Sequence, residues 1–447
     1  MRKLIRLWRG IQESLWFIPG VLVLLAVVLA AALVELDTRL GPDALKPWPL
    51  LFGVGADGSR GMLATIAGSM ITVAGTVFSI TLVVLALASS QYTSRVLRNF
   101  LADRANQTVL GVFVGVFAYC LVVMRTIRGG DEGAFVPSLA VLGGVVLAFV
   151  GIGYLIYFIH HISASIQASE ILASIAKATT YAIDHLFPDQ LGQDTDRTPA
   201  GDPADTRPGQ WRTVAAERTG YVQEVDEEAI LAFAKERHGV VRMERGIGEF
   251  VVEGTPLMSV LAANEPDPPD DGQLRGIYAV SRHRTVSQDA AFGIRQIVDV
   301  ALKALSPGVN DTTTAVMCLD HLAIVLVRLA DRRIPSPYRF DDDGELRVLA
   351  RVPSFHSLVG DSFDQIRQNA SANVAVLTRL LEVLELLEGR TGDAERRPVL
   401  LRQVRATDEV ARRTVPATID RQPIEERAAA LAERLERGPD ERTPVVA

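Results

Sequence analysis

The chain has 447 residues, of which 48% are hydrophobic and 22% are charged, and its formal net charge is −7 at pH 7. No basic stripe with interleaved aromatic residues appears in the sequence, so its pattern does not fit a nucleic-acid-binding protein. Of the two cysteines, Cys120 falls in an apolar run and Cys318 in a predicted helix, so we expect no structural disulfide and a reducing compartment for the soluble part.

Four long uncharged runs fill the first third of the chain. Each reaches the roughly 20 residues that a helix needs to cross about 30 Å of hydrocarbon. The first run is closely followed by Glu35 and Asp37, which does not suit a cleaved signal peptide, although Ala30–Ala32 keeps that alternative open. We therefore predict four transmembrane helices, at about 15–34, 61–89, 105–124 and 133–159.

Basic residues near these runs predict the orientation in the membrane. Four precede the first run, and Arg95, Arg98 and Arg104 crowd the short segment between the second and third runs. Because cytoplasmic loops carry the excess of Lys and Arg, we expect a cytoplasmic N-terminus. An even number of spans then places the C-terminus in the cytoplasm as well.

The second run carries its hydroxyl residues on one side. At 100° per residue, five of them fall within an arc of about 80°, with Gly68 and Gly75 beside it: Thr65, Ser69, Thr72, Thr76 and Ser79. Such a stripe fits a helix that lines a water-filled path or one that packs closely on another helix. Under the first interpretation, Val83 and Leu87 on the same face would form an apolar constriction.

The soluble remainder is acidic, with 34 Lys and Arg against 45 Asp and Glu after residue 160. Its patterns predict an α+β domain. Strands are expected at Gly220–Val225 and Gly239–Met243, and two more bracket a turn at 253–256. The predicted organisation is a membrane domain at 1–160, a helix leaving the membrane at 161–188, a linker at 189–210, a β-rich subdomain at 211–280, a helical-hairpin subdomain at 281–390 and a charged tail at 391–447.

A turn in the soluble part is the most distinctive motif there. Ser287 is expected to cap a first helix, and Asp311 a second helix from Thr312 to about Arg333. Between them, Pro307 ends the first helix and Gly308 permits positive φ. One interpretation is a rigid helical hairpin; the other is an anion or partner contact at the second helix N-terminus, made by Pro307, Gly308, Asn310, Asp311 and Thr312. A further helix is expected from about Ser362 to Glu388.

Enzyme motifs and metal-ligand spacings are absent from the sequence, so we expect neither catalysis nor a cofactor nor a metal site. His160 and His161 are neighbours that point about 100° apart on a helix, so they cannot face one metal, and we expect them to be polar tips at the membrane interface. Asp320 and His321 are expected to form a surface pair rather than a catalytic dyad.

Three separated motifs carry a resemblance to a known family: Ser14–Pro19, the run Ala67–Thr93, and Ala304–Thr314. Together they resemble the predicted membrane proteins called domain of unknown function 2254, over nearly the whole chain. The resemblance implies a bacterial inner-membrane location and no established activity. It supplies no catalytic residue.

The leading hypothesis is an oligomeric channel or pore-forming transporter, in which the second span lines the pathway and the cytoplasmic domain gates it. The alternative is a membrane-anchored sensor or scaffold whose cytoplasmic domain binds a ligand or a protein. The expected partners are the lipid bilayer and further copies of the chain, while the permeant ion or solute remains open.

Overall fold

The computed structural model consists of two compact units, Met1–Ile171 (unit 1) and Leu172–Ala447 (unit 2). It describes residues 16–40, 55–91, 103–129, 135–165, 167–185, 193–194, 211–261, 271–391 and 393–437.

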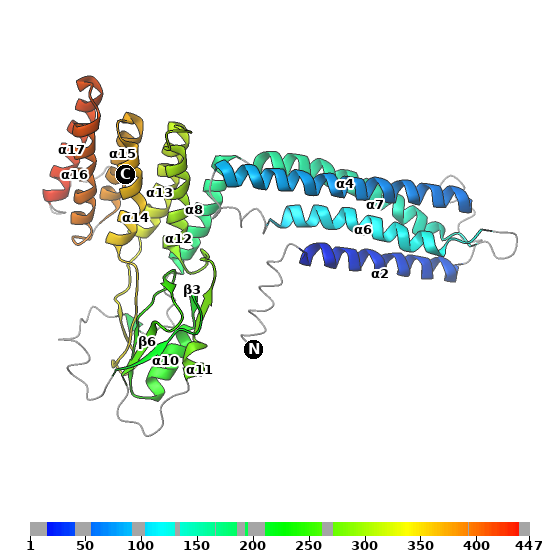
Figure 1. The fold of residues 1–447 in the computed structure, drawn as a ribbon, viewed down its shortest axis with the longest axis horizontal. Helices are drawn as coiled ribbons and strands as arrows, with labels where there is room; N and C mark the ends of the chain where they lie inside the picture. Colours follow the sequence, from blue (N-terminus) through cyan, green and yellow to red (C-terminus); the bar gives the residue numbers. More distant parts are fainter. Residues whose placement is uncertain are drawn as a thin grey trace, which may run out of the picture. The chain divides into compact units, whose positions relative to one another are not determined.

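Unit 1 contains four long helices that run side by side (Figure 1). They are α2 (Phe17–Leu40), α4 (Ala56–Gln91), α6 (Arg104–Thr126) and α7 (Ser138–Ser165). Helix α6 packs against each of the other three and is the most buried of them. Each helix covers most of one predicted span, and each is long and apolar enough to cross a membrane.

The bundle of unit 1 places a few polar groups at its helix ends. The buried carboxylate of Asp37 on α2 accepts from the amides of Leu139 and Ala140, over 3.1 and 3.0 Å, at the start of α7. The hydroxyl of Tyr119 on α6 donates to the Ala140 carbonyl over 2.7 Å. The two bonds to Asp37 supply an acceptor for amides that a helix start leaves unpaired.

Two sheets form the β part of unit 2. The larger sheet has the strand order β1-β8-β9-β4-β6-β2, and all its pairs are antiparallel except β4 with β9. Its strands are β1 (Gln193–Asp194), β2 (Trp211–Ala215), β4 (Val240–Met243), β6 (Pro256–Leu261), β8 (Tyr338–Phe340) and β9 (Leu346–Leu349). The smaller sheet, β5-β3-β7, comprises Phe250–Val251, Gly220–Val225 and Tyr278–Ser281. The short helices α10 (Glu227–Glu236) and α11 (Asp271–Arg275) complete this part.

The larger sheet gathers strands from distant parts of the chain. Strand β1 lies within the predicted linker at 189–210, and β8 and β9 lie within the predicted helical-hairpin subdomain. The two strands expected to bracket the turn at 253–256 do not pair with each other, since β5 pairs with β3, whereas β6 pairs with β2 and β4. Local spacing therefore identified these two strands but not their partners.

Helices form the rest of unit 2. They are α8 (Ala168–Asp184), which crosses the division between the units, α12 (Ala290–Ala304), α13 (Thr312–Ala330), α14 (Phe355–Ala370), α15 (Val374–Arg390), α16 (Arg397–Thr414) and α17 (Thr418–Arg437). The last two occupy most of the region predicted as a charged tail, and they pack on each other and on α15. Their apolar positions are buried: Leu400, Val404, Val410, Leu431 and Leu435.

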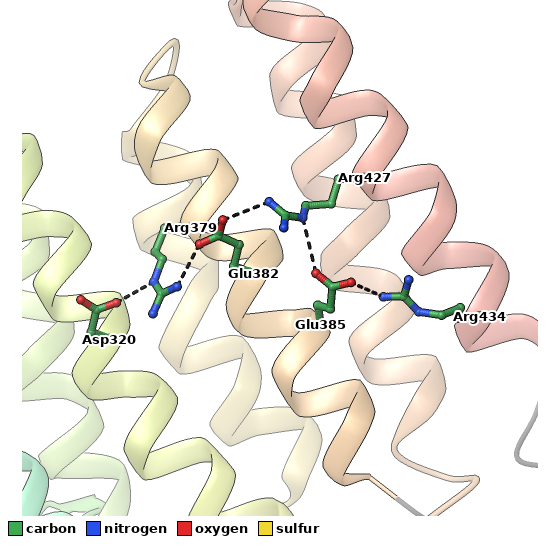
Figure 2. Close-up of polar contacts among 6 residues, drawn as sticks. All are labelled: Asp320, Arg379, Glu382, Glu385, Arg427 and Arg434. Atoms are coloured by element: carbon green, nitrogen blue, oxygen red, sulfur yellow. Dashed lines mark hydrogen bonds and ion pairs between the residues drawn. The ribbon is translucent and has the colours of Figure 1, made fainter. Parts of the chain in front are cut away.

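Helix α13 is the fifth helix that is apolar and long enough to cross a membrane. In unit 2 it packs against α12 and α15. Its Asp320 joins a chain of ion pairs that continues through α15 to α17 (Figure 2). At its other end, Arg328 pairs with Asp184 of α8 over 2.7 Å.

Candidate functional site

The hydroxyl residues of α4 lie on a face of that helix that the rest of unit 1 does not cover in the described part of the chain. All five predicted path-lining residues are exposed: Thr65, Ser69, Thr72, Thr76 and Ser79. The opposite face packs against α6 and carries the buried residues Leu63, Ala67, Met70, Ala74 and Val77. At about 100° per residue the two sets stand roughly opposite each other on the helix.

Four of these hydroxyl groups are bound to their own helix. Thr65, Thr72, Thr76 and Ser79 each donate to the carbonyl four residues earlier, over 2.8, 2.8, 3.1 and 2.9 Å. A Ser or Thr that bonds in this way donates its hydroxyl hydrogen to a carbonyl of its own helix, and the lone pairs of its oxygen remain turned outward. The face therefore offers uncharged acceptor oxygens to whatever lies beside it.

Apolar side chains flank the stripe on both edges. Met62 and Ile80 stand on one side, and Ile71, Phe78 and Leu82 on the other, and all five are exposed. Gly68 and Gly75 stand at the second edge, and a Cβ added at either would meet no atom within 4 Å. The glycines therefore do not serve close packing within the described part of unit 1.

The exposed faces of α2 and α7 are different. They carry large apolar side chains, as expected for contact with lipid: Leu24, Leu25 and Val28 on α2, and Phe149, Ile152 and Ile156 on α7. Only α4, among the four helices of unit 1, exposes a stripe of hydroxyl residues along its described length.

The two residues predicted to form a constriction lie on the same exposed face. Val83 is 59% exposed and Leu87 is 46% exposed. They follow Ser79 toward the C-terminal end of α4, so the face that carries the hydroxyl stripe continues with two apolar residues.

The turn between α12 and α13 forms a helical hairpin, with differences from the predicted details. Asp311 caps α13 as predicted, through a 3.0 Å bond from the Thr314 amide. The residue with positive φ is Asn310, at 48°, and not Gly308. Helix α12 is capped by Asp289 rather than by Ser287. Asparagine tolerates the left-handed region because its short polar side chain can bond locally, so glycine is not needed here.

The start of α13 already holds polar partners from its own chain. The Thr314 hydroxyl donates to Asp311 over 2.6 Å, and Asn373 at the start of α15 donates to the Thr312 hydroxyl over 2.7 Å. The hydrogen bonds from the Thr314 hydroxyl and amide lower the pKa of Asp311 from its usual value, so its carboxylate is ionised at neutral pH. Pro307 and Gly308 lie exposed at the tip of the turn. An ionised carboxylate at this position repels an incoming anion, which disfavours the anion interpretation.

The histidines singled out in the sequence have separate partners. His161 lies 2.5 Å from the Asp103 carboxylate and stacks on Tyr157. Asp320 pairs with Arg379, whereas His321 bonds the Met317 carbonyl. Within the described ranges, no group of three His, Cys, Asp or Glu side chains is placed to hold a metal ion.

Comparisons with known proteins identify the family. The model of a family described as predicted membrane protein, domain of unknown function 2254, matches residues 12–386. This chain belongs to that family. It is 35% identical to uncharacterized proteins of Mycobacterium tuberculosis and Mycobacterium bovis, over 96% of this chain and 82% of each relative. No solved structure matches it. The family resemblance seen in the sequence is thereby confirmed, and the chain is a predicted membrane protein of unknown function with several apolar helices.

Proposed function

We propose that this family member is an oligomeric channel of the bacterial inner membrane, in which α4 of each copy lines a shared path. The observation that carries the proposal is the exposed hydroxyl stripe on α4. In this proposal α2, α4, α6 and α7 span the membrane, both termini are cytoplasmic, and α13 remains in the cytoplasmic part.

The stripe and its flanks suit a ring of helices. A hydroxyl face gains nothing from contact with lipid tails, whereas it can hydrate a path between copies of the chain. The apolar edges at Ile80 and Phe78 then meet neighbouring copies, and the open glycine edge at Gly68 and Gly75 lets two backbones approach closely. Outward oxygen lone pairs favour water and cations over anions as the permeating species.

The alternative is a membrane-anchored sensor or scaffold in which α4 forms a dry seam between copies. The specific observation in its favour is that four hydroxyls are satisfied by their own helix, so they do not require water. The glycines at seven-residue spacing suit such a seam as well. Solvent access to the stripe distinguishes the two functions.

Cysteine labelling in membrane vesicles tests the proposal. In a chain with Cys120 and Cys318 replaced by alanine, single cysteines at Ser69, Thr72 and Thr76 should react with a small charged thiol reagent. Cysteines at Ile71 and Phe78, which are also exposed on α4 but stand off the stripe, should stay inert. Equal labelling of both sets, or labelling of neither, contradicts a water-filled path.

Flux through liposomes tests the constriction. Replacing Val83 by serine should raise the basal leak of cations, because an apolar gate that closes by dewetting is hydrated by a hydroxyl. The matched control is Leu82→Ser, one residue away and also exposed, at 50%, but off the stripe. If purified wild-type and Val83→Ser proteins both carry no flux, the channel proposal fails and the anchored sensor replaces it.

A reporter fused after Pro188 tests the orientation, because four spans with a cytoplasmic N-terminus place that position in the cytoplasm. A reporter active only on the outer side of the membrane overturns this topology.

A further inference from the structure

A cleft of about 550 Å³ lies in unit 2 between the β part and the starts of α12 and α14. A volume of this size fits a small organic molecule. The turn 246–249, the segment 350–354 and the first residues of the two helices line it. Its charged lining consists of four carboxylates and two guanidinium groups: Glu227, Glu249, Asp289, Asp361, Arg284 and Arg351.

The two arginine side chains that line this cleft are already paired with carboxylates. Arg284 holds Asp289 with two hydrogen bonds of 2.8 and 2.9 Å, and Arg351 pairs with Glu249. Gly248, at φ of 82°, packs so closely on the Arg284–Asp289 pair that a Cβ there would overlap both side chains. The pair is therefore fixed in place and is not available as an anion clamp.

The two helix starts that border the cleft are capped from within. Asp289 accepts from the Phe292 amide over 2.9 Å at the start of α12. At the start of α14, Ser354 and Ser357 cap each other's backbone amides reciprocally. Neither helix start therefore offers the strong anion site that an uncapped one would provide.

Two acceptor oxygens on residues that line the cleft, in contrast, have no hydrogen-bond donor. Glu227, the first residue of α10, is 9% exposed, and its Oε2 atom has no hydrogen-bond partner in the described part of the chain. The Oε1 atom of Gln288, which also lines the cleft, is buried and likewise has no partner in the described part of the chain. A buried acceptor without a donor is destabilising, so both groups gain from a ligand that brings N–H groups.

We propose that this cleft binds a small organic cation, which donates N–H groups to Glu227 and Gln288. Carboxylates outnumber guanidinium groups on the walls, and the unpaired groups are acceptors. A bare metal ion fits less well, because no group of three metal-ligating side chains exists among the described residues and the cleft is much larger than an ion.

Titration calorimetry on the full chain in detergent, with putrescine as the probe, tests this site. Wild type and Glu228→Gln, which changes an exposed neighbour on the same helix, should bind putrescine with equal affinity. Glu227→Gln should bind at least tenfold more weakly, because it keeps the shape of the protonated acid and removes the charge. Inorganic phosphate should show no saturable binding.

The pH dependence gives a readout that needs no variant. Burial raises the pKa of Glu227 to about 7, with Arg339 opposing the shift and Asp226 adding to it. The ionised fraction of such a group rises about tenfold between pH 6 and pH 8, so putrescine affinity should rise by a similar factor. The other charged groups that line the cleft are Arg284 with Asp289, Glu249 with Arg351, and Asp361.

Asp361 is a second titrating group in the cleft, because burial raises its pKa against the opposing charges of Arg295 and Arg284. Asp361→Asn should keep the pH dependence if Glu227 is the ionising ligand. A pH dependence that disappears with Asp361→Asn overturns the proposal. So does putrescine binding of equal affinity to Glu227→Gln and to wild type. The absence of saturable putrescine binding, or saturable binding of phosphate, overturns it as well.

Discussion

Helix α13 of unit 2 and helix α4 of unit 1 are both apolar enough to cross a membrane, but their polar side chains bond to different partners. In α13, Asp320 and Arg328 bond to charged side chains of other helices. In α4, four of the five stripe hydroxyls bond to their own backbone, and all five residues are exposed. Where polar groups find their partners therefore distinguishes these helices better than apolar composition does.

The first prediction concerns burial along α13. Leu322 is fully buried, whereas Ile324 on the same helix is 56% exposed. Leu322→Ala should lower the free energy of unfolding by about 2–5 kcal/mol, and Ile324→Ala should change it little. Urea unfolding of the full chain in detergent measures both. An equal loss of unfolding free energy in the two variants would contradict the arrangement in which α13 buries only one of its faces in unit 2.

The second prediction concerns the buried carboxylate of unit 1. Asp37→Ala removes the partner of two amides at the start of α7, which should destabilise the bundle by about 2 kcal/mol. Glu35→Ala is the control, because Glu35 is exposed on the same helix and pairs with Arg39. Unfolding in mixed detergent micelles measures the loss. A larger effect of Glu35→Ala would show that α2 and α7 do not meet at Asp37.

Sequence reasoning identified some local features, assigned others wrongly, such as the α12 cap expected at Ser287, and missed the nonlocal contacts. The cap at Asp311 was predicted and is confirmed, because a capping residue acts on amides two or three positions away. The helix expected from Ser362 to Glu388 is two helices, α14 and α15, separated at Ser371, which has a φ of 43°. Apolar residues on both sides of the break concealed it, and no proline marks it.

Of the two candidate sites, one could be predicted from the sequence and the other could not. The α4 stripe was visible in the sequence because it is a periodic feature of one helix. The cleft was not, because Glu227, Arg284 and Asp361 lie on segments that only the folded chain brings together. Glu227 directly follows a capping aspartate, where acidic residues are common for the helix dipole alone, so its sequence context gives no sign of a site.

The third prediction concerns the hairpin turn. Asn310→Val places a β-branched residue at a φ of 48° and should cost about 1–2 kcal/mol. Gly308→Val is the matched control, since Gly308 does not have positive φ and a Cβ there meets nothing within 4 Å. Thermal unfolding of the full chain compares the two. A greater loss from Gly308→Val would restore glycine as the residue that the turn requires.

The smallest effect is expected from the ion pairs that join α13 to its neighbours. Arg379 contacts Asp320 over 2.6 Å and Glu382 over 2.9 Å, and Glu382 continues the chain to Arg427 of α17 (Figure 2). These side chains are about one-third exposed, so water and salt screen them, and Arg379→Met should cost no more than about 1 kcal/mol.

The loss should shrink further in 1 M NaCl, because the Debye length there is about 3 Å. Arg405→Met, which breaks a single exposed pair with Glu436, should have no measurable effect. A helix embedded in hydrocarbon behaves differently, since removal of Arg379 would leave the Asp320 charge without a partner in a medium that cannot solvate it. A salt-independent loss above about 2 kcal/mol would therefore assign α13 to the membrane and remove the distinction between it and the helices of unit 1.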